Sequence, residues 1–292
     1  MIEFLREGHN IILRSTIAPG TTNFVKNYLE QKIDLKFGKN IFLSFCPERI
    51  AEGKAIEEIY NLPQIVSSYN SSVTTRVSNL FKKLTQDIIV LDPTEAELAK
   101  LYTNSWRYIQ FAIANQFYML ANGHGKDFYK IYNAMTFKYP RTKSFPKAGF
   151  AAGPCLLKDT MQLSAFSGNR FGLGSAAVTA NEGLPLYLIE RLESRFQLAE
   201  MTVGILGMAF KGETDDNRSS LSYKLRKLLS FRAREVLCSD PYVVDDRLVD
   251  LHKLLHESDL VIVATPHVVY QSLDIEKPIV DIWNLYGRGV QV

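Results

Sequence analysis

The sequence predicts an α/β protein built from two sheet-containing segments and a helical middle. Short apolar runs alternate with helical patterns before residue 92 and again after residue 200. This alternation is typical of parallel sheets whose crossovers are helices. Between the two segments, one long helical pattern runs from 94 to 122. The fold class is therefore the later part of a doubly wound sheet, a central helical region, and a second, parallel α/β domain.

In the first segment, apolar runs flanked by polar residues predict strands, and longer amphipathic patterns predict helices. The predicted strands are 10–15, 40–45, 64–68 and 88–91, and the predicted helices are 22–36 and 71–84. In open α/β sheets ligands gather at the carboxyl ends of strands. Thr16 follows the first of these strands, and Glu48 and Glu52 follow the second, so these side chains fall where a site is expected.

The middle of the chain is predicted to be helical. Thr94 and Glu97 predict a capping box, and apolar residues then recur at helical spacing until Gly123 ends the pattern. Residues 123–180 continue as a helical region, and 181–196 form a further helix. Such a long helix is able to link two domains.

From Thr202 on, the sequence predicts the second α/β domain. The predicted strands are 202–206, 235–239, 260–264 and 278–282, and the predicted helices are 219–230 and 248–256. Asp240 follows a strand, where a dinucleotide fold places its ribose-binding acid, but no G-x-G-x-x-G precedes it. The stretch 172–177 fits G-x-G-x-x-A, yet it follows polar residues and no strand, so we do not interpret it as a phosphate loop.

Composition narrows the classes of function. The net charge of +3 and the lack of a Lys/Arg run argue against nucleic-acid binding. No apolar run is long enough to predict a membrane span. Cys46, Cys155 and Cys238 are far apart and odd in number, which argues against a disulfide framework and favours a reducing, cytoplasmic compartment. Nothing in the sequence has the spacing of metal ligands.

One stretch carries reactive chemistry, and it runs from Gly149 to Asp159. Small residues there let the backbone approach a ligand, and Pro154 fits the first turn of a helix. Cys155 would lie at that helix N-terminus, where unpaired N–H groups and the helix dipole favour a thiolate. Asp159 lies one turn further on. The alternative is an inert core cysteine.

Two other pairs repeat this spacing. Glu48 and Glu52 are four residues apart, and so are Lys100 and Asn104. At that spacing each pair shares one face of a helix. Either pair alone also fits an ordinary solvated helix surface, whereas together with the cysteine stretch they indicate a site.

These motifs, taken in order, resemble those of the UDP-glucose/GDP-mannose dehydrogenase family, and the resemblance covers nearly the whole chain. They are Ser15-Thr16-Ile17-Ala18-Pro19-Gly20-Thr21-Thr22, Pro47-Glu48 through Glu52-Gly53, Lys100 with Asn104, Gly153-Pro154-Cys155 through Lys158-Asp159, and Ala209-Phe210-Lys211 with Thr214-Asp215-Asp216 and Arg218.

The resemblance implies NAD as cofactor, a UDP-sugar as substrate, and a homodimer through the central helix. It implies a partial NAD-binding, Rossmann-like domain at 1–92, a central domain at 93–199, and a UDP-sugar-binding domain at 200–292. No Gly-rich turn with a later acid stands before Asn10. We therefore expect that the N-terminal part of the NAD-binding domain, with its phosphate loop, is lacking.

The reaction implied by the resemblance is the oxidation of a sugar C6 alcohol to a carboxylate, with two NAD⁺ consumed. Cys155 would trap the aldehyde, Lys100 and Asn104 would stabilise oxyanions, and Asp159, Glu48 and Thr16 would hold or activate water. Ser15, Thr16, Glu52 and Arg218 would face NAD. Lys211, Arg141, Lys100 and Asn104 would contact the substrate.

The chain also departs from the family pattern. Ala152-Gly153 stands where two glycines are usual, and Leu157 replaces a usual proline. The segments 139–141 and 145–146 look more like the branch that oxidises UDP-N-acetylhexosamines. Two alternatives stay open: a catalytically silent sugar-nucleotide-binding or assembly fragment, and a cysteine hydrolase. The second is weakly supported, because the histidines lack a nucleophile-partner context.

Overall fold

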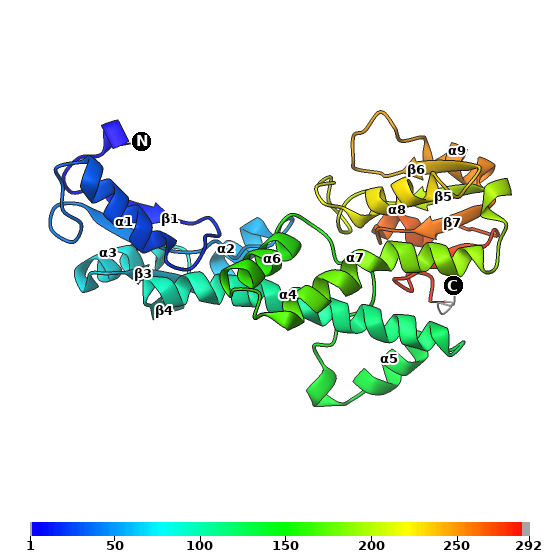
Figure 1. Ribbon diagram of the computed structural model, residues 1–292, viewed down its shortest axis with the longest axis horizontal. Coiled ribbons are helices and arrows are strands. Elements are labelled where there is room, and N and C mark those ends of the chain that lie inside the picture. The colour runs from blue at the N-terminus through cyan, green and yellow to red at the C-terminus, as the bar shows by residue number, and fades with distance from the viewer. Residues whose placement is uncertain (1, 288–292) are drawn as a thin grey trace. The chain divides into compact units, whose positions relative to one another are not determined.

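The computed structural model describes residues 2–287 and divides into two compact units. The first unit holds the residues up to Ser105 together with Gln162–Arg170, and the second holds Trp106–Met161 and the residues from Phe171 on. Each unit contains one four-stranded sheet (Figure 1). No helix within residues 2–287 has the length and hydropathy of a membrane span.

The sheet of the first unit has the strand order β1-β2-β3-β4. Its strands are β1 (Asn10–Leu13), β2 (Phe42–Phe45), β3 (Gln64–Ser68) and β4 (Ile88–Leu91). The pairs β1/β2 and β3/β4 are parallel, but β2 and β3 are antiparallel, with Ser44 opposite Ser68. The strand positions agree with those predicted, whereas the antiparallel pair was not predicted by the alternation of elements.

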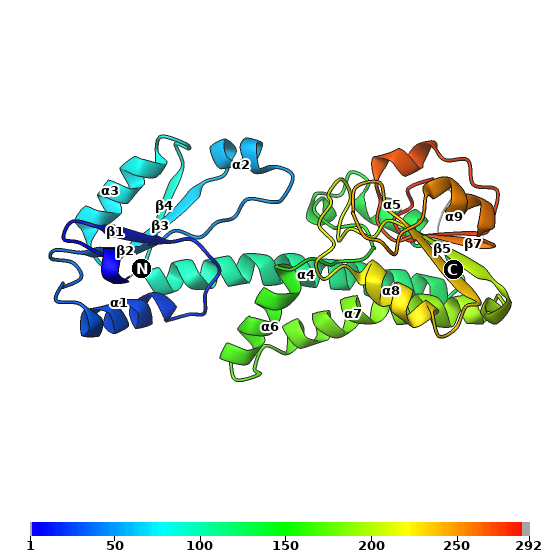
Figure 2. The same cartoon turned by 90° about the horizontal axis from the view of Figure 1, so that it is seen from above.

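Helices cover both faces of this sheet (Figure 2). They are α1 (Thr21–Lys32), α3 (Ser71–Phe81) and the start of α4 (Pro93–Gly123), and a short helix α2 (Ala55–Asn61) precedes β3. Because side chains alternate along a strand, Ile65 packs with Ala96 of α4 while Val66 packs with Val73 of α3. Strand β3 is thus covered on both faces.

The start of α4 differs from the prediction. Its capping box consists of Asp92, which accepts the Thr94 N–H at 2.8 Å, and Glu95, which accepts the Asp92 N–H at 2.8 Å. The predicted box of Thr94 and Glu97 is wrong because the Glu97 carboxylate is turned toward the start of α1.

Further helices follow in the middle of the chain. They are α5 (Phe128–Thr136), the short η2 (Pro140–Thr142), α6 (Leu156–Phe166) and α7 (Gly172–Glu193). Helix α7 begins at Gly172, before the predicted start at residue 181. The prediction missed its first turns because they are rich in Gly and Ala and lack an apolar periodicity. The G-x-G-x-x-A stretch is therefore the first turn of a helix that no strand precedes.

The sheet of the second unit is wholly parallel, with the order β6-β5-β7-β8. Its elements are β5 (Thr202–Leu206), α8 (Leu221–Leu229), β6 (Glu235–Ser239), α9 (Leu251–Glu257), β7 (Leu260–Val263) and β8 (Ile279–Asp281). Ile262 packs toward α7 and α8, while Val261 and Val263 pack toward α9. The strand order reverses between β5 and β7, so the crevice at their carboxyl ends is where a ligand is expected.

Candidate functional site

In the first unit, Glu48 lies on the loop that follows β2. Its carboxylate forms an ion pair with Arg14 and accepts the N–H groups of Arg49 (2.8 Å) and Ile50 (2.9 Å). Burial acts to raise the pKa of Glu48, but the hydrogen bonds from Arg14 and Ile50 outweigh it and hold the pKa below its usual value. The side chain stays 43% exposed and lines a cavity of about 280 Å³. Glu48 is therefore an accessible carboxylate.

The Glu48 loop is not the helix that the spacing predicted. Residues 46–51 have no regular structure, and residues 52–53 form a turn with Gly53 at φ 79°. The expectation that Glu48 and Glu52 share a helical face is wrong. The Glu48 carboxylate takes up the N–H groups that follow it, which competes with helix formation.

The loop that carries Ser15 and Thr16 is held by Glu97, a residue whose role the sequence did not reveal. The Glu97 carboxylate is buried and accepts the N–H groups of Gly20 (2.5 Å) and Thr22 (2.7 Å) and the Thr22 hydroxyl (2.6 Å). It thereby satisfies donors at the start of α1, where an anion is favourable.

Lys100 and Asn104 lie one turn apart on α4, as predicted, and both belong to the first unit. Asn104 is buried, while Lys100 is partly exposed. Helix α4 continues beyond Ser105 into the second unit.

In the second unit, Cys155 directly precedes α6 and is exposed. Its carbonyl accepts the N–H of Asp159 at 2.9 Å, so the two residues lie one helical turn apart. Asp159 is buried, and its carboxylate lies 3.5 Å from the Lys158 ammonium.

The two other cysteines differ from Cys155. Both Cys46 and Cys238 are buried, and burial raises the pKa of each thiol to about 11. They are therefore neutral thiols near neutral pH. Of the three cysteines, Cys155 alone has both the exposure and the helix N-terminus that a nucleophile needs.

The start of the cysteine loop, which we define as residues 148–155, is fixed by buried polar contacts. The Asn115 amide oxygen accepts the Gly149 N–H at 2.9 Å, and its nitrogen donates to Asn181 at 2.9 Å. The Tyr129 hydroxyl lies 2.8 Å from the Ile282 carbonyl oxygen and 3.3 Å from that of Ala148. These contacts tie the loop to α4, α5, α7 and the end of β8.

Two aromatic rings pack directly on glycines of this loop. A Cβ atom at Gly149 would lie 2.3 Å from the Trp283 ring, and one at Gly153 would lie 2.7 Å from the Phe210 ring. Both positions also have positive φ, 154° and 106°. Glycine is required at both places because the rings occupy the volume of any side chain. The sequence pattern showed the glycines but not the aromatic partners.

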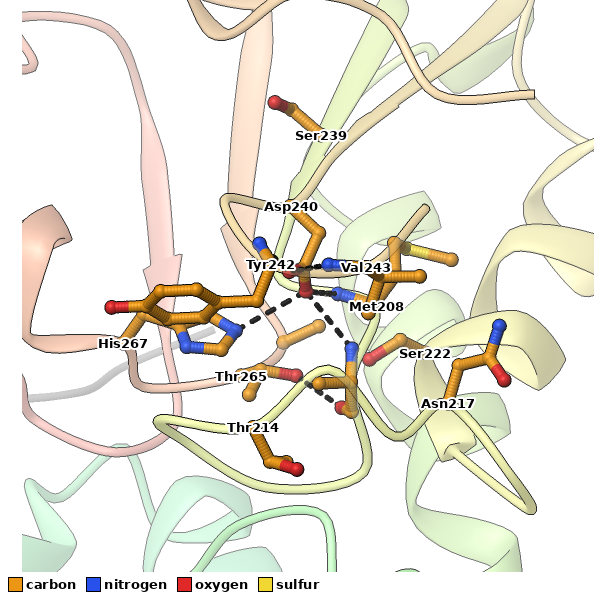
Figure 3. A network of polar contacts seen from close by, with 12 residues as sticks. Met208, Thr214, Asn217, Ser222, Ser239, Asp240, Tyr242, Val243, Thr265 and His267 are labelled. Carbon is orange, nitrogen blue, oxygen red and sulfur yellow. Dashed lines mark hydrogen bonds and ion pairs between the residues drawn. The ribbon is translucent and has the colours of Figure 1, made fainter. Parts of the chain in front are cut away.

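The loop that follows β5, residues 207–216, carries Phe210 and Lys211 and is anchored by Asp240 (Figure 3). The Asp240 carboxylate accepts the N–H groups of Met208 (2.6 Å) and Ala209 (2.9 Å). Its other oxygen accepts the N–H groups of Tyr242 (2.8 Å) and Val243 (2.9 Å). We call this loop the β5 loop.

His267 completes the anchor. Its Nδ1 accepts the Glu213 N–H at 3.1 Å, which leaves Nε2 as the donor to Asp240 at 3.2 Å (Figure 3). Both side chains are fully buried. Burial alone would raise the pKa of Asp240, but the hydrogen bonds from His267 and the backbone hold it well below its usual value. Asp240 is thus engaged within the fold and is not placed as a ribose-binding acid.

The remaining predicted residues belong to the second unit, where Arg141 and Arg218 are exposed and Lys211 is partly buried. The Lys211 ammonium lies 5.7 Å from the centre of the Phe210 ring. Arg218 donates to both oxygens of Asp216, at 2.6–2.9 Å. Arg141, on η2, donates to the Tyr139 hydroxyl at 2.9 Å. Within residues 2–287, His, Cys, Asp and Glu form no cluster suited to a metal ion.

The structure therefore brings together Glu48 with Arg14, Lys100 with Asn104, and Cys155 with Asp159. The first two pairs belong to the first unit and the third to the second unit. A common site for all of them stays a prediction.

Comparison with known proteins assigns the three parts of the chain. Sequence profiles of the UDP-glucose/GDP-mannose dehydrogenase family match residues 1–85 with its NAD binding domain, 94–182 with its central domain, and 204–288 with its UDP binding domain. NAD is accordingly the cofactor. The match of residues 1–85 does not bear out the expectation that the N-terminal part of the NAD-binding domain is lacking.

Individual relatives agree with the profiles. The UDP-N-acetyl-D-mannosamine dehydrogenase of Pyrococcus horikoshii is 30% identical, over 99% of this chain and 68% of that protein. The UDP-N-acetyl-D-mannosamine dehydrogenase of Methanocaldococcus jannaschii is 26% identical, over 98% of this chain and 65% of that protein.

Solved structures show the same similarity. A UDP-D-ManNAc dehydrogenase from Pyrococcus horikoshii superimposes with a TM-score of 0.89 at 29% identity, covering 97% of this chain and 71% of that one. A UDP-glucose dehydrogenase from Pyrobaculum islandicum gives 0.84 at 28% identity, covering 94% and 67%. The protein described here belongs to the UDP-glucose/GDP-mannose dehydrogenase family.

Proposed function

We propose that the protein oxidises the C6 alcohol of a UDP-sugar to the carboxylate through a thioester on Cys155. The observation that supports this most directly is the state of the cysteines. Cys155 is exposed at the N-terminus of α6, whereas Cys46 and Cys238 are buried thiols with raised pKa values. We propose that four residues face NAD. In the NAD-binding domain these are Ser15 and Thr16, which follow β1, and Glu52, which follows β2. The fourth is Arg218.

The net reaction converts the alcohol, two NAD⁺ and water into the carboxylate, two NADH and three protons. NAD⁺ supplies the hydride acceptor for both oxidations. Between them, the Cys155 thiolate adds to the aldehyde carbon, forming a C–S bond and an oxyanion. The second oxidation gives a thioester. Water then adds to its carbonyl carbon, the C–S bond breaks, and the thiolate leaves as the acid forms.

The other residues have distinct proposed roles. The Lys100 ammonium and Asn104 amide donate to the oxyanions, and donors that are fixed in advance stabilise such charge most effectively. Asp159 and Glu48 hold or activate the attacking water, and Thr16 orders it. Glu48 is available for this task because its carboxylate is ionised near neutral pH and its side chain remains accessible.

We propose a UDP-N-acetylhexosamine as the substrate, bound by Lys211 and Arg141 besides Lys100 and Asn104. The relatives from Pyrococcus and Methanocaldococcus, which are named for UDP-N-acetyl-D-mannosamine, support this choice, as do the motifs at 139–141 and 145–146. Initial rates with UDP-N-acetyl-D-mannosamine and UDP-glucose, followed by NADH absorbance, test it. A preference for UDP-glucose would contradict it.

We also propose a homodimer through α4. Trp106, Ile113, Phe117 and Leu120 are 38–61% exposed and recur at the spacing of one helical face. Sedimentation equilibrium of the wild type should give a dimer, and Leu120→Glu should give a monomer, because a charge on that face cannot be buried in an interface. A monomeric wild type would contradict the proposal.

A second function, a silent sugar-nucleotide-binding or assembly module, rests on one sequence observation. Residues 1–92 contain no G-x-G-x-x-G turn. Such a turn supplies most anion contacts to the cofactor in dinucleotide folds, and the module would bind a sugar nucleotide without turnover. Calorimetry with UDP, beside NADH production, separates the two functions. UDP binding with no NADH favours the module, and sustained NADH production rules it out.

A further inference from the structure

Phe210 joins the β5 loop to the cysteine loop in the second unit. Its ring occupies the place of a side chain at Gly153, where a Cβ atom would lie 2.7 Å from Cδ2 and 2.9 Å from Cε2. Gly153 precedes Cys155 by two residues. On the other side, Phe210 precedes Lys211, whose ammonium lies 5.7 Å from the ring centre. One aromatic ring therefore packs on a glycine next to the proposed nucleophile and also lies beside a proposed substrate ligand.

The β5 loop behind Phe210 is fixed in its backbone. The Phe210 N–H donates to the Asp216 carbonyl at 2.9 Å, which closes the loop on itself. The Ala209 carbonyl accepts the hydroxyls of Thr265 (2.7 Å) and Ser220 (3.2 Å), beside the Asp240 anchor (Figure 3). A displacement of the Phe210 backbone therefore requires the loop to shift with it.

The cysteine loop contacts the Phe210 ring at Gly153. Its start is held by Asn115, Tyr129 and Trp283, as described above. Close-packed side chains transmit small shifts because no free volume absorbs them. A ligand that moves Lys211 and Phe210 should thus act on Gly153 and, through it, on the placement of Cys155.

We propose that Phe210 is a positioning residue that couples occupancy of the β5 loop by the UDP part of the substrate to the reactivity of Cys155. This inference rests on the proposed function, since it takes the β5 loop as the place of substrate binding and Cys155 as the nucleophile. The proposed chemistry gives the ring no contact with the reacting carbon, and its effect is exerted through Gly153.

The test measures alkylation of Cys155 by iodoacetamide near neutral pH, with and without UDP, which lacks the sugar. Cys46 and Cys238 are buried and serve as internal references. In the wild type, saturating UDP should change the Cys155 rate several-fold. In Phe210→Leu, UDP should still bind by calorimetry, but the change in rate should be lost. Phe210→Tyr should restore it, because the ring is kept.

A matched control makes the same substitution away from the loop. Phe196 packs partly buried against the core of the second unit, so Phe196→Leu should keep the full effect of UDP. Phe210→Met keeps more of the buried volume than Phe210→Leu but also removes the ring, so it should lose the effect while UDP still binds. It replaces Phe210→Leu if that variant does not fold.

Turnover gives a second readout. If Phe210 positions Cys155, Phe210→Leu should lower kcat about tenfold with little change in KM, as expected for a small misplacement of a reacting group. The inference is overturned if Phe210→Leu keeps the full effect of UDP, or if the wild type binds UDP with no change at Cys155. A wild type that does not bind UDP at all would instead remove the proposed function.

Discussion

Glu48 and Asp240 are two carboxylates in similar positions with different surroundings. Each follows a strand of its sheet, β2 for Glu48 and β6 for Asp240, and each has a pKa below its usual value. Glu48 is 43% exposed, is paired with one cation and lines a cavity. Asp240 is fully buried, and both of its oxygens accept hydrogen bonds from within the fold.

The difference separates an acid available for chemistry from one that holds the fold. Ligands approach the carboxyl ends of parallel strands, so position alone made both acids candidates. A carboxylate with every acceptor site occupied by protein donors cannot also bind substrate. Asp240 instead fixes the β5 loop, which carries Lys211.

The largest expected effect is that of Glu48→Gln on catalysis. If Glu48 activates water, the variant should lose about 10³-fold in kcat. Its free energy of unfolding should change by less than about 1 kcal/mol, because the side chain is partly exposed. Initial rates and urea unfolding measure the two quantities. A variant that keeps its rate and loses stability would show that Glu48, like Asp240, has a structural role.

Asp240→Asn should show the opposite pattern. An amide offers one acceptor oxygen where the carboxylate offers two, so buried N–H groups lose their partners, at a cost of about 3 kcal/mol in the free energy of unfolding. Urea unfolding of the purified chain measures this. A change in the free energy of unfolding no larger than the experimental error would show that the anchor does not stabilise the second unit.

The Asp240 anchor also predicts a dependence of stability on pH. Because its pKa is lower in the folded than in the unfolded protein, its stabilisation is present above about pH 4, the usual range for an aspartate, and is lost as the pH falls through the folded-state pKa. Asp240→Asn should therefore have a flatter acid limb of stability. If the stability of Asp240→Asn falls as steeply at acid pH as that of the wild type, the acid loss of stability comes from other groups.

A smaller effect is expected at Arg14. Arg14→Met removes a cation that helps to lower the pKa of Glu48, so this pKa should rise as the effect of burial is opposed less strongly. The acid limb of the pH profile of kcat/KM should move to higher pH, with the rate at alkaline pH retained. A profile that does not move would show that Glu48 does not act as a base.

The smallest effect is expected at the rim of the Asp240 anchor. The Tyr242 hydroxyl donates to Glu213 at 3.2 Å on the exposed side. Tyr242→Phe should change the free energy of unfolding by less than about 0.5 kcal/mol, since surface substitutions seldom do more. A loss comparable to that of Asp240→Asn would mean that the anchor extends to the surface.

The sequence predicted strands and helices well because hydrophobic periodicity reports burial. The strands 64–68, 88–91, 202–206 and 235–239 have the predicted bounds. The antiparallel pairing of β2 and β3 could not be predicted, because periodicity carries no information on strand direction. The helical interpretation of 46–53 was wrong because spacing alone does not show that Glu48 binds its own backbone.

For the candidate site, the sequence supplied residue types but not their partners. Cys155 was placed at a helix N-terminus from its Gly-Pro context, and the structure confirms that position. The contacts of Phe210 and Trp283 on glycines join segments far apart in the chain, so no local pattern predicts them. Glu97 had the residue type of a capping box, but its distant partners Gly20 and Thr22 decide its role.

The central claim is that Cys155 carries the intermediate between the two oxidations. A single-turnover experiment tests it most directly, with protein in excess over UDP-N-acetyl-D-mannosamine and NAD⁺ saturating. The wild type should release two NADH for each sugar, and Cys155→Ser should release at most one. Two NADH for each sugar from Cys155→Ser would contradict the thioester mechanism.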